Sequence, residues 1–342
     1  MGKLMIRFDA GANIGLGHFT RMNELGRYMV ELGHQVMGFC RRLPGSPFSA
    51  NFPVHFLSPE EDKAMEEMER WIQQERPDRF VFDLQYIPQG AVDMVKNEKV
   101  KVIVFDDYGE EWRKADLVID AVKHWNREEV NLHNFRGVYH CGPAWCIFRP
   151  EFRLIHPVNP SKDLLITFGG SDPGGFTEKA IKALSGTDIF VTVLIGQANE
   201  RKKKIMELAG KALKQFEILT DVNNTREIFL AHRLVLSAAG LTLYELSLLG
   251  IPSLTLAYDQ LQLKTAKRFH EAGTTINLGY GAEYQWRQLP NQVKKILTDH
   301  DLLNKMKVMG PQTVKDGGLE RIATEIMALP GRDFDGTEHL ID

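Results

Sequence analysis

The segment RFDAGANIGLGHFTR, residues 7–21, places glycines, a histidine and charged side chains between an apolar run and a helical pattern. Gly15 and Gly17 allow the backbone to approach a ligand closely or to adopt a positive φ. The free N–H groups of the helix that starts after Gly17 favour negative charge. Because an imidazole can gain or lose a proton near neutral pH, His18 is a candidate general acid or base. The segment therefore predicts a loop for an anionic ligand beside a proton-transfer residue.

Asp9 and Arg21 flank this loop, and each has two interpretations. Asp9 is either a second catalytic residue or a turn residue. Arg21 lies one turn into the helix, where it would bind phosphate or pair with the neighbouring Glu24. The glycines also suit a simple tight turn. The loop is no dinucleotide fingerprint, since Thr20 stands where GxGxxG needs glycine, and the chain has no GK[ST] tripeptide of a P-loop.

A second glycine-rich loop, GGSDPGG, follows the apolar run at residues 164–168. Gly170 and Ser171 can present N–H groups and a hydroxyl to a phosphate or a base. We therefore expect these two residues in a ligand site.

A third loop, with Ser237, Gly240, Leu241 and Thr242, lies between a strand-type run and a helical run. Thr242 can cap that helix and also face an anion, because the neighbouring amides are unpaired. Glu245 is well placed to accept hydrogen bonds from ribose hydroxyls. The alternative is a capping box, Thr242-x-x-Glu245, with no ligand. That alternative leaves Gly240 and the GGSDPGG loop unexplained.

Strand-type runs alternate with helical runs on both sides of a proline-containing stretch at 148–163. The alternation predicts an α/β protein of two doubly wound parallel-sheet, Rossmann-like domains that face a cleft, with ligands beyond the carboxyl ends of the strands. We expect an N-terminal domain at 1–155, a C-terminal domain at 156–330 and a polar tail at 331–342. The helical segments 286–299 and 318–329 close the second domain, or one of them crosses back to the first. The expected strands are 4–8, 35–39, 54–57, 79–83, 100–105, 117–120 and 138–141, then 164–168, 189–195, 216–219, 234–237 and 253–257.

The composition is that of an ordinary globular protein, with 342 residues, 43% of them hydrophobic and 25% charged, and a net charge of −3. This charge gives no whole-chain attraction to nucleic acid or anionic membrane. Glycines, Glu245 and Pro252 interrupt the most apolar stretch, 234–258, so we expect no stable membrane insertion. No signal-peptide pattern opens the chain. We expect a reduced cytoplasmic protein whose oligomeric state the sequence leaves open.

The cysteines and the remaining histidines carry no metal or disulfide signature. Three cysteines are too few and too irregular for a disulfide framework or a metal knuckle. The histidines of residues 124–156 lack the spacing of a zinc site, and we interpret them as structural or surface residues. We therefore expect no metal and no cofactor. Asp106, Asp107 and Tyr108 follow the strand 100–105, where they are either functional or an ordinary turn. The histidines in question are His124, His133, His140 and His156.

Four segments together resemble one family. RFDAGANIGLGHFTR, CGPAWCIFRPEF, ITFGGSDPGG and SAAGLTLYELSLLGIPSLTLAYDQ resemble, in this order, the UDP-sugar hydrolases of pseudaminic acid biosynthesis and the related spore coat polysaccharide biosynthesis proteins. The resemblance runs from about residue 5 to residue 275. The second half is also similar to the nucleotide-sugar domain of the glycosyltransferase that makes lipid II, which has the two-domain GT-B architecture.

This resemblance implies a UDP-sugar substrate bound by the second domain. Gly170 and Ser171 would lie near the diphosphate or uracil, Gly240 and Thr242 at the phosphates, and Glu245 on the ribose. The sugar would extend across the cleft to His18, which matches the histidine proposed as the acid/base residue of the hydrolases. Water would displace UDP at the anomeric carbon with inversion, in the biosynthesis of a surface polysaccharide or nonulosonic acid.

Two departures from the family pattern concern the substrate. The Asp-x-Tyr motif of the family is FDLQYIP here, so Asp83 and Tyr86 are three residues apart, and the motif makes Tyr86 a candidate catalytic residue. Asp259 and Gln260 stand where the family has Asn-Gln. An ionised Asp259 can only accept hydrogen bonds, so near a diphosphate it would repel. Either Asp259 contacts sugar hydroxyls, with Gln260 also in the substrate site, or the substrate differs.

Three functions remain open. The first is a nucleotide-sugar hydrolase that releases UDP from an acetamido or deoxy sugar, like the UDP-2,4-diacetamido-2,4,6-trideoxy-β-L-altropyranose hydrolases. The second is a GT-B glycosyltransferase with a UDP-sugar donor, which would need an acceptor site on the first domain. The third is a sugar-nucleotide-binding protein without catalysis.

Overall fold

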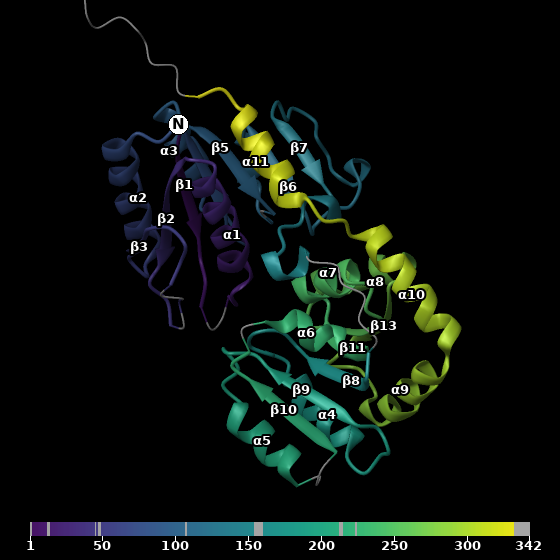
Figure 1. Ribbon diagram of the computed structural model, residues 1–342. Helices are drawn as coiled ribbons and strands as arrows, with labels where there is room; N and C mark the ends of the chain where they lie inside the picture. Colours follow the sequence, from purple (N-terminus) through teal and green to yellow (C-terminus); the bar gives the residue numbers. More distant parts are fainter. Residues whose placement is uncertain are drawn as a thin grey trace, which may run out of the picture. The chain divides into compact units, whose positions relative to one another are not determined.

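The computed structural model describes residues 2–11, 14–44, 46, 49–106, 108–153, 160–211, 215–222 and 224–331. The chain divides into two compact units. Unit 1 comprises residues 1–147 and 317–342, and unit 2 comprises residues 148–316. Each unit holds its own parallel sheet with helices on both faces, as the alternating sequence pattern predicts (Figure 1).

Unit 1 contains a seven-stranded parallel sheet with the order β3-β2-β1-β4-β5-β6-β7. Its strand order reverses at β1, between β2 and β4, which is the switch point where doubly wound sheets bind ligands. The strands are β1 (Lys3–Phe8), β2 (Gln35–Arg41), β3 (Val54–Leu57), β4 (Arg79–Asp83), β5 (Lys101–Phe105), β6 (Leu117–Asp120) and β7 (Val138–Cys141). The α-helices of this unit are α1 (Gly17–Glu31), α2 (Glu61–Glu75), α3 (Ala91–Asn97) and α11 (Gly318–Ala328).

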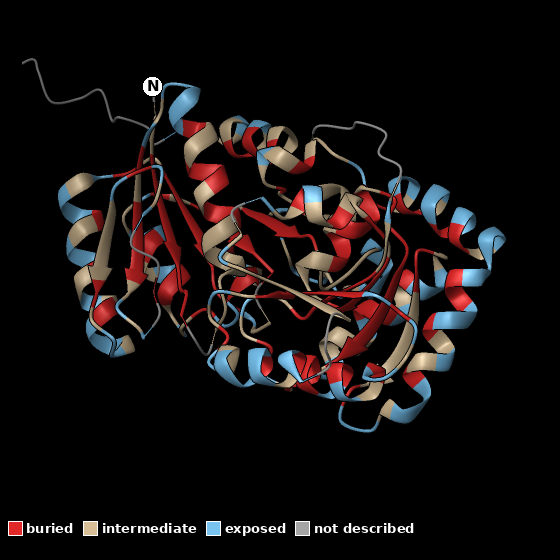
Figure 2. Cartoon of the chain, turned by 60° about the horizontal axis from the view of Figure 1, so that its bottom comes forward, coloured by how far each residue is buried: buried red, intermediate tan, exposed pale blue. Residues whose placement is uncertain are grey.

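Alternation along the strands of unit 1 divides its core between the two faces of the sheet. Leu4, Ile6 and Phe8 pack with residues of α1 and α11, whereas Met5 packs on the opposite face with residues of α2 and α3. Figure 2 shows the same arrangement in the colouring, with buried strands and helices whose outer faces are exposed. The carboxyl ends of the strands, and the loops that follow them, lie at one edge of this sandwich.

Unit 2 contains a six-stranded parallel sheet with the order β10-β9-β8-β11-β12-β13. The strand order reverses at β8, which has β9 on one side and β11 on the other, and this is the second switch point. The strands are β8 (Lys162–Thr167), β9 (Val191–Ile195), β10 (Phe216–Thr220), β11 (His232–Ala238), β12 (Ser253–Ala257) and β13 (Thr275–Tyr280). The α-helices are α4 (Phe176–Leu184), α5 (Lys202–Gly210), α6 (Thr225–Leu230), α7 (Leu241–Leu248), α8 (Gln260–Glu271), α9 (Leu289–Thr298) and α10 (His300–Thr313).

The domain boundaries differ from those predicted. The first unit ends at Ile147 rather than at residue 155, and α11 belongs to unit 1 rather than to the C-terminal domain. Its residues Leu319 and Ile322 are buried in the core beside α1, and the Arg79 guanidinium donates to the backbone oxygen of Ile326 at 2.8 Å. The physical reason is the apolar face of α11, which the first sheet buries. The predicted tail lies, apart from Gly331, outside the described residues.

Candidate functional site

The first glycine loop leads directly into α1. Gly15 has a φ of +84°, which favours glycine, and its backbone exchanges two hydrogen bonds with Gly11. Gly17 is the first residue of α1, and among the described residues no side chain caps this helix. Its first turn also contains no acidic residue. Residues 12 and 13 lie outside the described part of the loop.

His18, in the first turn of α1, is held by a buried carboxylate. Its Nδ1 lies 2.7 Å from Oδ1 of Asp83, the last residue of β4, whose side chain is 0% exposed. Burial alone would raise the pKa of Asp83, but Arg21 and His18 lower it below its usual value. An ionised Asp83 only accepts hydrogen bonds, so the Nδ1 proton points to it. In the neutral imidazole, this hydrogen bond leaves on Nε2 the lone pair with which a base takes a proton.

Arg21 faces inward rather than toward a phosphate. Its Nε donates to Oδ2 of Asp83 at 2.6 Å, its Nη2 donates to Oδ1 of Asp83, and its Nη1 donates to Asp106. The side chain is only 8% exposed. The sequence offered two roles for Arg21, phosphate binding and pairing with Glu24. The contacts observed here, with Asp83 and Asp106, match neither of them.

Asp9 and Tyr86 lie in different surroundings from His18. Asp9 is buried at the end of β1, where Arg7 donates to it and Arg41 donates through Nε at 2.8 Å. Burial would raise its pKa, and the two arginines lower it below the usual value. Tyr86 lies on the loop after β4, is 65% exposed and has its ring 6.1 Å from that of Tyr108. Asp9 therefore has the contacts of a structural carboxylate, while the exposed Tyr86 can reach a ligand.

Two further carboxylates occupy the same edge of the sheet: Asp106, which the sequence left open as functional or an ordinary turn, and Asp120, which the sequence prediction missed. Asp106 directly follows β5, and Asp120 ends β6. Asp120 accepts from Nδ1 of His124 at 2.6 Å and from the hydroxyl of Tyr139. The available signal was that β4, β5 and β6 are each followed or ended by aspartate in the segments RFVFD, KVIVFD and LVID. Asp107 and His156 lie outside the described residues.

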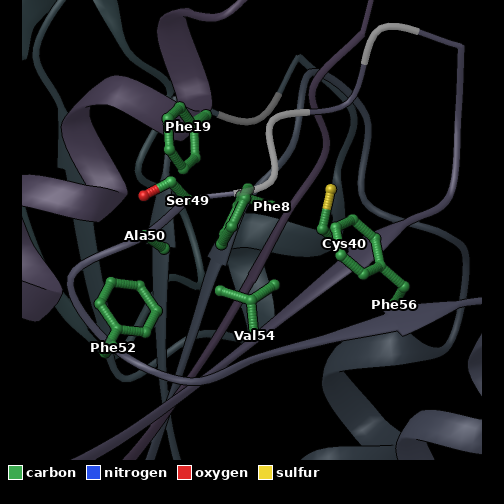
Figure 3. A pocket seen from close by; sticks show the side chains of 8 residues that line it. All are labelled: Phe8, Phe19, Cys40, Ser49, Ala50, Phe52, Val54 and Phe56. Carbon is green, nitrogen blue, oxygen red and sulfur yellow. The ribbon is translucent and has the colours of Figure 1, made fainter.

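Unit 1 also contains a cavity of about 240 Å³, seen in Figure 3. It lies on the α1 face of the sheet near β1, β2 and β3, and Phe19, the residue after His18, is one of its lining residues. None of the described residues that line it is charged, so they supply no cation to a phosphate. Its lining residues are Phe8, Phe19, Cys40, Ser49, Ala50, Phe52, Val54 and Phe56.

In unit 2, the N-terminus of α7 is open. Gly240 is the N-cap residue, its backbone is extended, and no side chain caps the helix. A Cβ at Gly240 would meet nothing within 4 Å. Thr242 and Glu245 thus form no capping box, since Glu245 instead has Oε1 3.4 Å from Nη2 of Arg149. The first amides of α7 are therefore available to an anion. Leu241 and Thr242 supply two of these amides.

Neighbouring helices of unit 2 are capped by their own side chains. Asp172 accepts from the amides of Phe176 and Thr177 at 2.9 and 3.0 Å at the start of α4. Asp259 accepts from the amide of Gln262 at 2.8 Å at the start of α8. These carboxylates already supply the negative charge that the two helix N-termini favour. An incoming phosphate is consequently favoured at α7 over α4 or α8.

The remaining predicted residues of unit 2 lie near the carboxyl ends of β8, β11 and β12. Gly170 and Gln260 are exposed, and Ser171 is half-buried. Ser237, at the end of β11, is 0% exposed, and its hydroxyl has no hydrogen-bond partner among the described residues. A buried hydroxyl without a partner is unusual. It lies three residues before Gly240, on the strand that leads into the open helix.

The pKa of Glu245 is raised, because its surroundings compensate its negative charge only in part. Burial raises its pKa to about 7, and Arg149 offsets only part of this effect. Arg149 is shared, since it also donates to the hydroxyl of Thr225 at 2.8 Å and pairs with Glu151 at 2.9 Å. Near neutral pH Glu245 therefore exists both as an acid and as a carboxylate, and a hydrogen-bond donor such as a ribose diol would favour the carboxylate.

Neither a metal site nor a membrane-spanning helix is found in the part of the chain that the structure describes. No three histidine, cysteine or acidic side chains there are placed to hold a metal ion. None of the helices there has both the length and the apolarity needed to cross a bilayer.

Comparisons with known proteins agree with this architecture. Residues 175–318 match the glycosyltransferase family 28 C-terminal domain. The chain is similar to the spore coat polysaccharide biosynthesis protein SpsG of Bacillus subtilis (strain 168), with 23% identity over 331 residues, which cover 94% of this chain and 96% of SpsG. Its fold is similar to MurG of Acinetobacter baumannii, with a TM-score of 0.69 and 15% identity over 96% of this chain and 99% of MurG. The calicheamicin glycosyltransferase CalG4 gives a TM-score of 0.65 and 14% identity over 96% and 98%.

The protein has the GT-B fold. Two parallel α/β sheets, one per unit, and the similarity to GT-B glycosyltransferases over nearly the whole chain establish it. Residues 175–318 thus resemble a glycosyltransferase domain, and nearly the whole chain is similar to a protein of spore coat polysaccharide biosynthesis.

Proposed function

We propose that this protein is a nucleotide-sugar hydrolase that releases UDP from a UDP-linked acetamido or deoxy sugar. Unit 2 binds the nucleotide, with the diphosphate at the first turn of α7 and the ribose hydroxyls on Glu245. Unit 1 supplies His18 as the base. The product would enter the synthesis of a surface polysaccharide, consistent with the name of SpsG.

The reaction needs one proton acceptor and one site for a leaving anion. Nε2 of His18 takes a proton from water while the water oxygen bonds to the anomeric carbon. The bond between that carbon and the β-phosphate oxygen breaks, and its electron pair leaves with UDP. Charge that grows on the diphosphate is stabilised by the open amides of α7, which is stabilisation of the kind an oxyanion hole provides. His18 then passes its proton to solvent.

The observation that carries the proposal is the pair formed by His18 and the buried Asp83 at 2.7 Å. A histidine that merely caps a helix or lies on a surface needs no buried carboxylate behind Nδ1. The arrangement matches the orienting carboxylate of a catalytic triad, which holds the imidazole in the tautomer that acts as a base. The exposed Tyr86 is a proposed contact to the sugar, and we propose no chemical step for Asp9.

A glycosyltransferase is the second candidate function. The family 28 match and the fold similarity to MurG and CalG4 support it as well as they support hydrolysis. The same His18–Asp83 pair would then deprotonate a hydroxyl of an acceptor instead of water. The cavity beside Phe19 could hold an apolar part of such an acceptor.

Incubation with UDP-2,4-diacetamido-2,4,6-trideoxy-β-L-altrose and a panel of other UDP-sugars, without any acceptor, tests the proposal. We expect free UDP and free sugar in equal amounts from at least one donor. His18→Ala should lower this turnover by roughly 100-fold or more while UDP binding stays unchanged. His34→Ala is the matched control, because His34 binds the amide of Gly2 at the opposite end of β1.

Turnover that appears only after an acceptor is added would contradict hydrolysis and favour the transferase. UDP binding without turnover of any donor, with or without acceptor, would favour a sugar-nucleotide-binding protein. Equal turnover in wild type and His18→Ala would remove His18 from the mechanism.

A further inference from the structure

Three parallel strands of unit 1 direct aspartates to one edge of the sheet, and a single arginine lies among them. Asp83 ends β4, Asp106 follows β5 and Asp120 ends β6, and these strands are neighbours in the sheet. All three carboxylates are buried. Arg21 reaches two of them from the second turn of α1.

Arg21 uses each nitrogen of its guanidinium on these carboxylates. Nε and Nη2 bind the two oxygens of Asp83 as a fork, and Nη1 binds Oδ2 of Asp106. Nη2 also lies 3.5 Å from Nδ1 of His18. The other oxygen of Asp106 accepts from the amide of Val122 at 3.1 Å. The planar fork of arginine is thereby fixed at both ends, which a lysine could not reproduce.

The positive charge of Arg21 stabilises the ionised form of the buried Asp83. Two carboxylates buried near each other cannot both ionise without a cation between them. Burial raises the pKa of Asp106 to about 6, and the nearby Asp120 and Asp83 add to the effect against the opposing charge of Arg21. The pKa of Asp83 is instead lowered, with Arg21 the largest favourable contribution. The guanidinium thus favours the charge on the carboxylate that contacts His18.

Phosphate binding and a purely structural ion pair are the competing explanations. Phosphate binding conflicts with a side chain that is only 8% exposed and has its donors engaged. A structural role is a weaker explanation, because a buried ion pair often contributes little net stability compared with apolar residues. A structural role also does not explain why the fork binds the carboxylate that orients His18.

We propose that Arg21 and Asp106 are positioning residues for His18: Asp106 anchors the guanidinium, and Arg21 holds Asp83 ionised and oriented toward Nδ1. This inference rests on the proposed function, since it assigns the residues behind its base. Neither residue contacts substrate in this account. Arg21 acts through Asp83, and Asp83 acts through the tautomer and direction of the imidazole.

A double-mutant cycle with His18 tests the inference. Arg21→Gln should lower kcat for UDP release by roughly 10- to 100-fold, with KM and the Kd for UDP unchanged, because misorientation of a catalytic group costs about this much. In the His18→Ala background, Arg21→Gln should change the residual rate less than about twofold, because its route to the reaction is gone. Arg27→Gln, which removes an arginine of the same helix that pairs with Glu24 and Glu31, is the matched control and should leave kcat unchanged.

Two milder variants keep the test valid if Arg21→Gln does not fold. Arg21→Lys retains the charge but loses the fork, and Asp106→Asn removes the anchor; both should lower kcat by about three- to tenfold. A spectroscopic readout separates positioning from stability: nitrogen NMR should show His18 with its proton on Nδ1 in the wild type and a mixture of tautomers in these variants.

The outcomes separate failure of this inference from failure of the proposed function. If His18→Ala lowers turnover but Arg21→Gln then lowers the residual rate by the same factor as in the wild-type background, Arg21 acts independently of His18 and the inference is wrong. An unchanged His18 tautomer in Arg21→Lys and Asp106→Asn would overturn it as well. If His18→Ala itself retains full turnover, the proposed function fails first.

Discussion

At the residue scale, unit 1 and unit 2 use buried carboxylates in opposite ways. Asp83 is kept ionised by a fixed arginine, so it can hold a histidine in one tautomer. Glu245 shares Arg149 with Thr225 and Glu151, so burial raises its pKa to about 7. Without a ligand, Asp83 is therefore ionised at neutral pH, whereas Glu245 is there divided between its acid and its carboxylate form.

Glu245→Gln should reveal this difference through pH. A carboxyl whose pKa is higher in the folded than in the unfolded protein reduces the free energy of unfolding as pH rises between the two values. Here that window runs from about 4.5 to about 7. Chemical denaturation without ligand should therefore show Glu245→Gln more stable than wild type by roughly 1–3 kcal/mol at pH 8, and equally stable at pH 4.

Glu245→Gln should also bind UDP less tightly than wild type. A rise in pH, which favours the variant in stability, should favour wild type in UDP affinity. In the proposed site the ionised carboxylate would accept from both ribose hydroxyls, so the affinity advantage of wild type over Glu245→Gln should grow between pH 6 and pH 8. The comparison with Glu245→Gln cancels the titration of the phosphate itself. If calorimetry gives the same ratio of the two Kd values at pH 6 and at pH 8, Glu245 does not bind the ribose.

The candidate residues show what could be inferred from residue types alone. His18 and its loop could be selected because glycines, an apolar run and a helical pattern surround it. The direction of Arg21 could not, since it depends on strand ends 62 and 85 residues away. That the N-terminus of α7 is uncapped could not be inferred either, because the spacing of Thr242 and Glu245 suits a capping box equally well.

At the element scale, the N-terminus of α7 differs from those of α4 and α8 because no carboxylate among the described residues accepts from its first amides, as Asp172 and Asp259 do at those two helices. Gly240→Asp would supply a cap with a negative charge, and Gly240→Asn a cap of the same shape without one. The backbone there has a negative φ of −97° and open space at Cβ, so both side chains fit. Each should raise the stability of unit 2 by a few tenths of a kcal/mol.

The two variants should differ in their affinity for UDP. The carboxylate of Gly240→Asp repels a diphosphate, so its Kd should rise by roughly 10- to 100-fold over that of Gly240→Asn. Titration of UDP followed by calorimetry at low salt measures both values. Equal Kd values for the Asp and Asn variants would place the phosphates away from α7.

Most strands could be predicted, because buried parallel strands are short apolar runs between loops. The predicted ranges 54–57, 79–83, 117–120, 138–141 and 253–257 coincide with β3, β4, β6, β7 and β12. β13 was missed because TINLGY forms no continuous apolar run and is only half-buried at the sheet edge. α10 was missed because Gly310 and Pro311 suggest a loop, although the proline lies in its final turn.

At the scale of the whole molecule, the last helix of the chain belongs to the first unit. α11 buries Leu319, Ile322, Ala323 and Ile326 beside α1, and Arg79 binds the carbonyl oxygens of Ile326 and Leu329 at 2.8 and 2.6 Å. Alternation of strands and helices indicates how many sheets a chain forms, but it does not indicate which sheet a terminal helix covers. That choice depends on the apolar area each sheet leaves open.

Ile322→Ala should therefore destabilise unit 1 and leave unit 2 intact. Loss of a fully buried isoleucine costs about 2–5 kcal/mol. Thr324→Ala, at an exposed position of the same helix, is the control. Limited proteolysis should cleave Ile322→Ala within residues 1–147 while a fragment near 148–316 persists, and UDP affinity should remain at the wild-type value. Equal protection of residues 1–147 in both variants would show that α11 is dispensable to unit 1.

The most direct test of the central claim follows the oxygen of water. The protein is incubated with a UDP-sugar that it turns over, without acceptor, in water enriched in ¹⁸O, and both products are analysed by mass spectrometry. Attack at the anomeric carbon by water that His18 activates predicts one ¹⁸O in the free sugar, none in UDP, and loss of the labelled sugar in His18→Ala. Label in the phosphate of UDP, or labelled sugar formed equally well by His18→Ala, would contradict it.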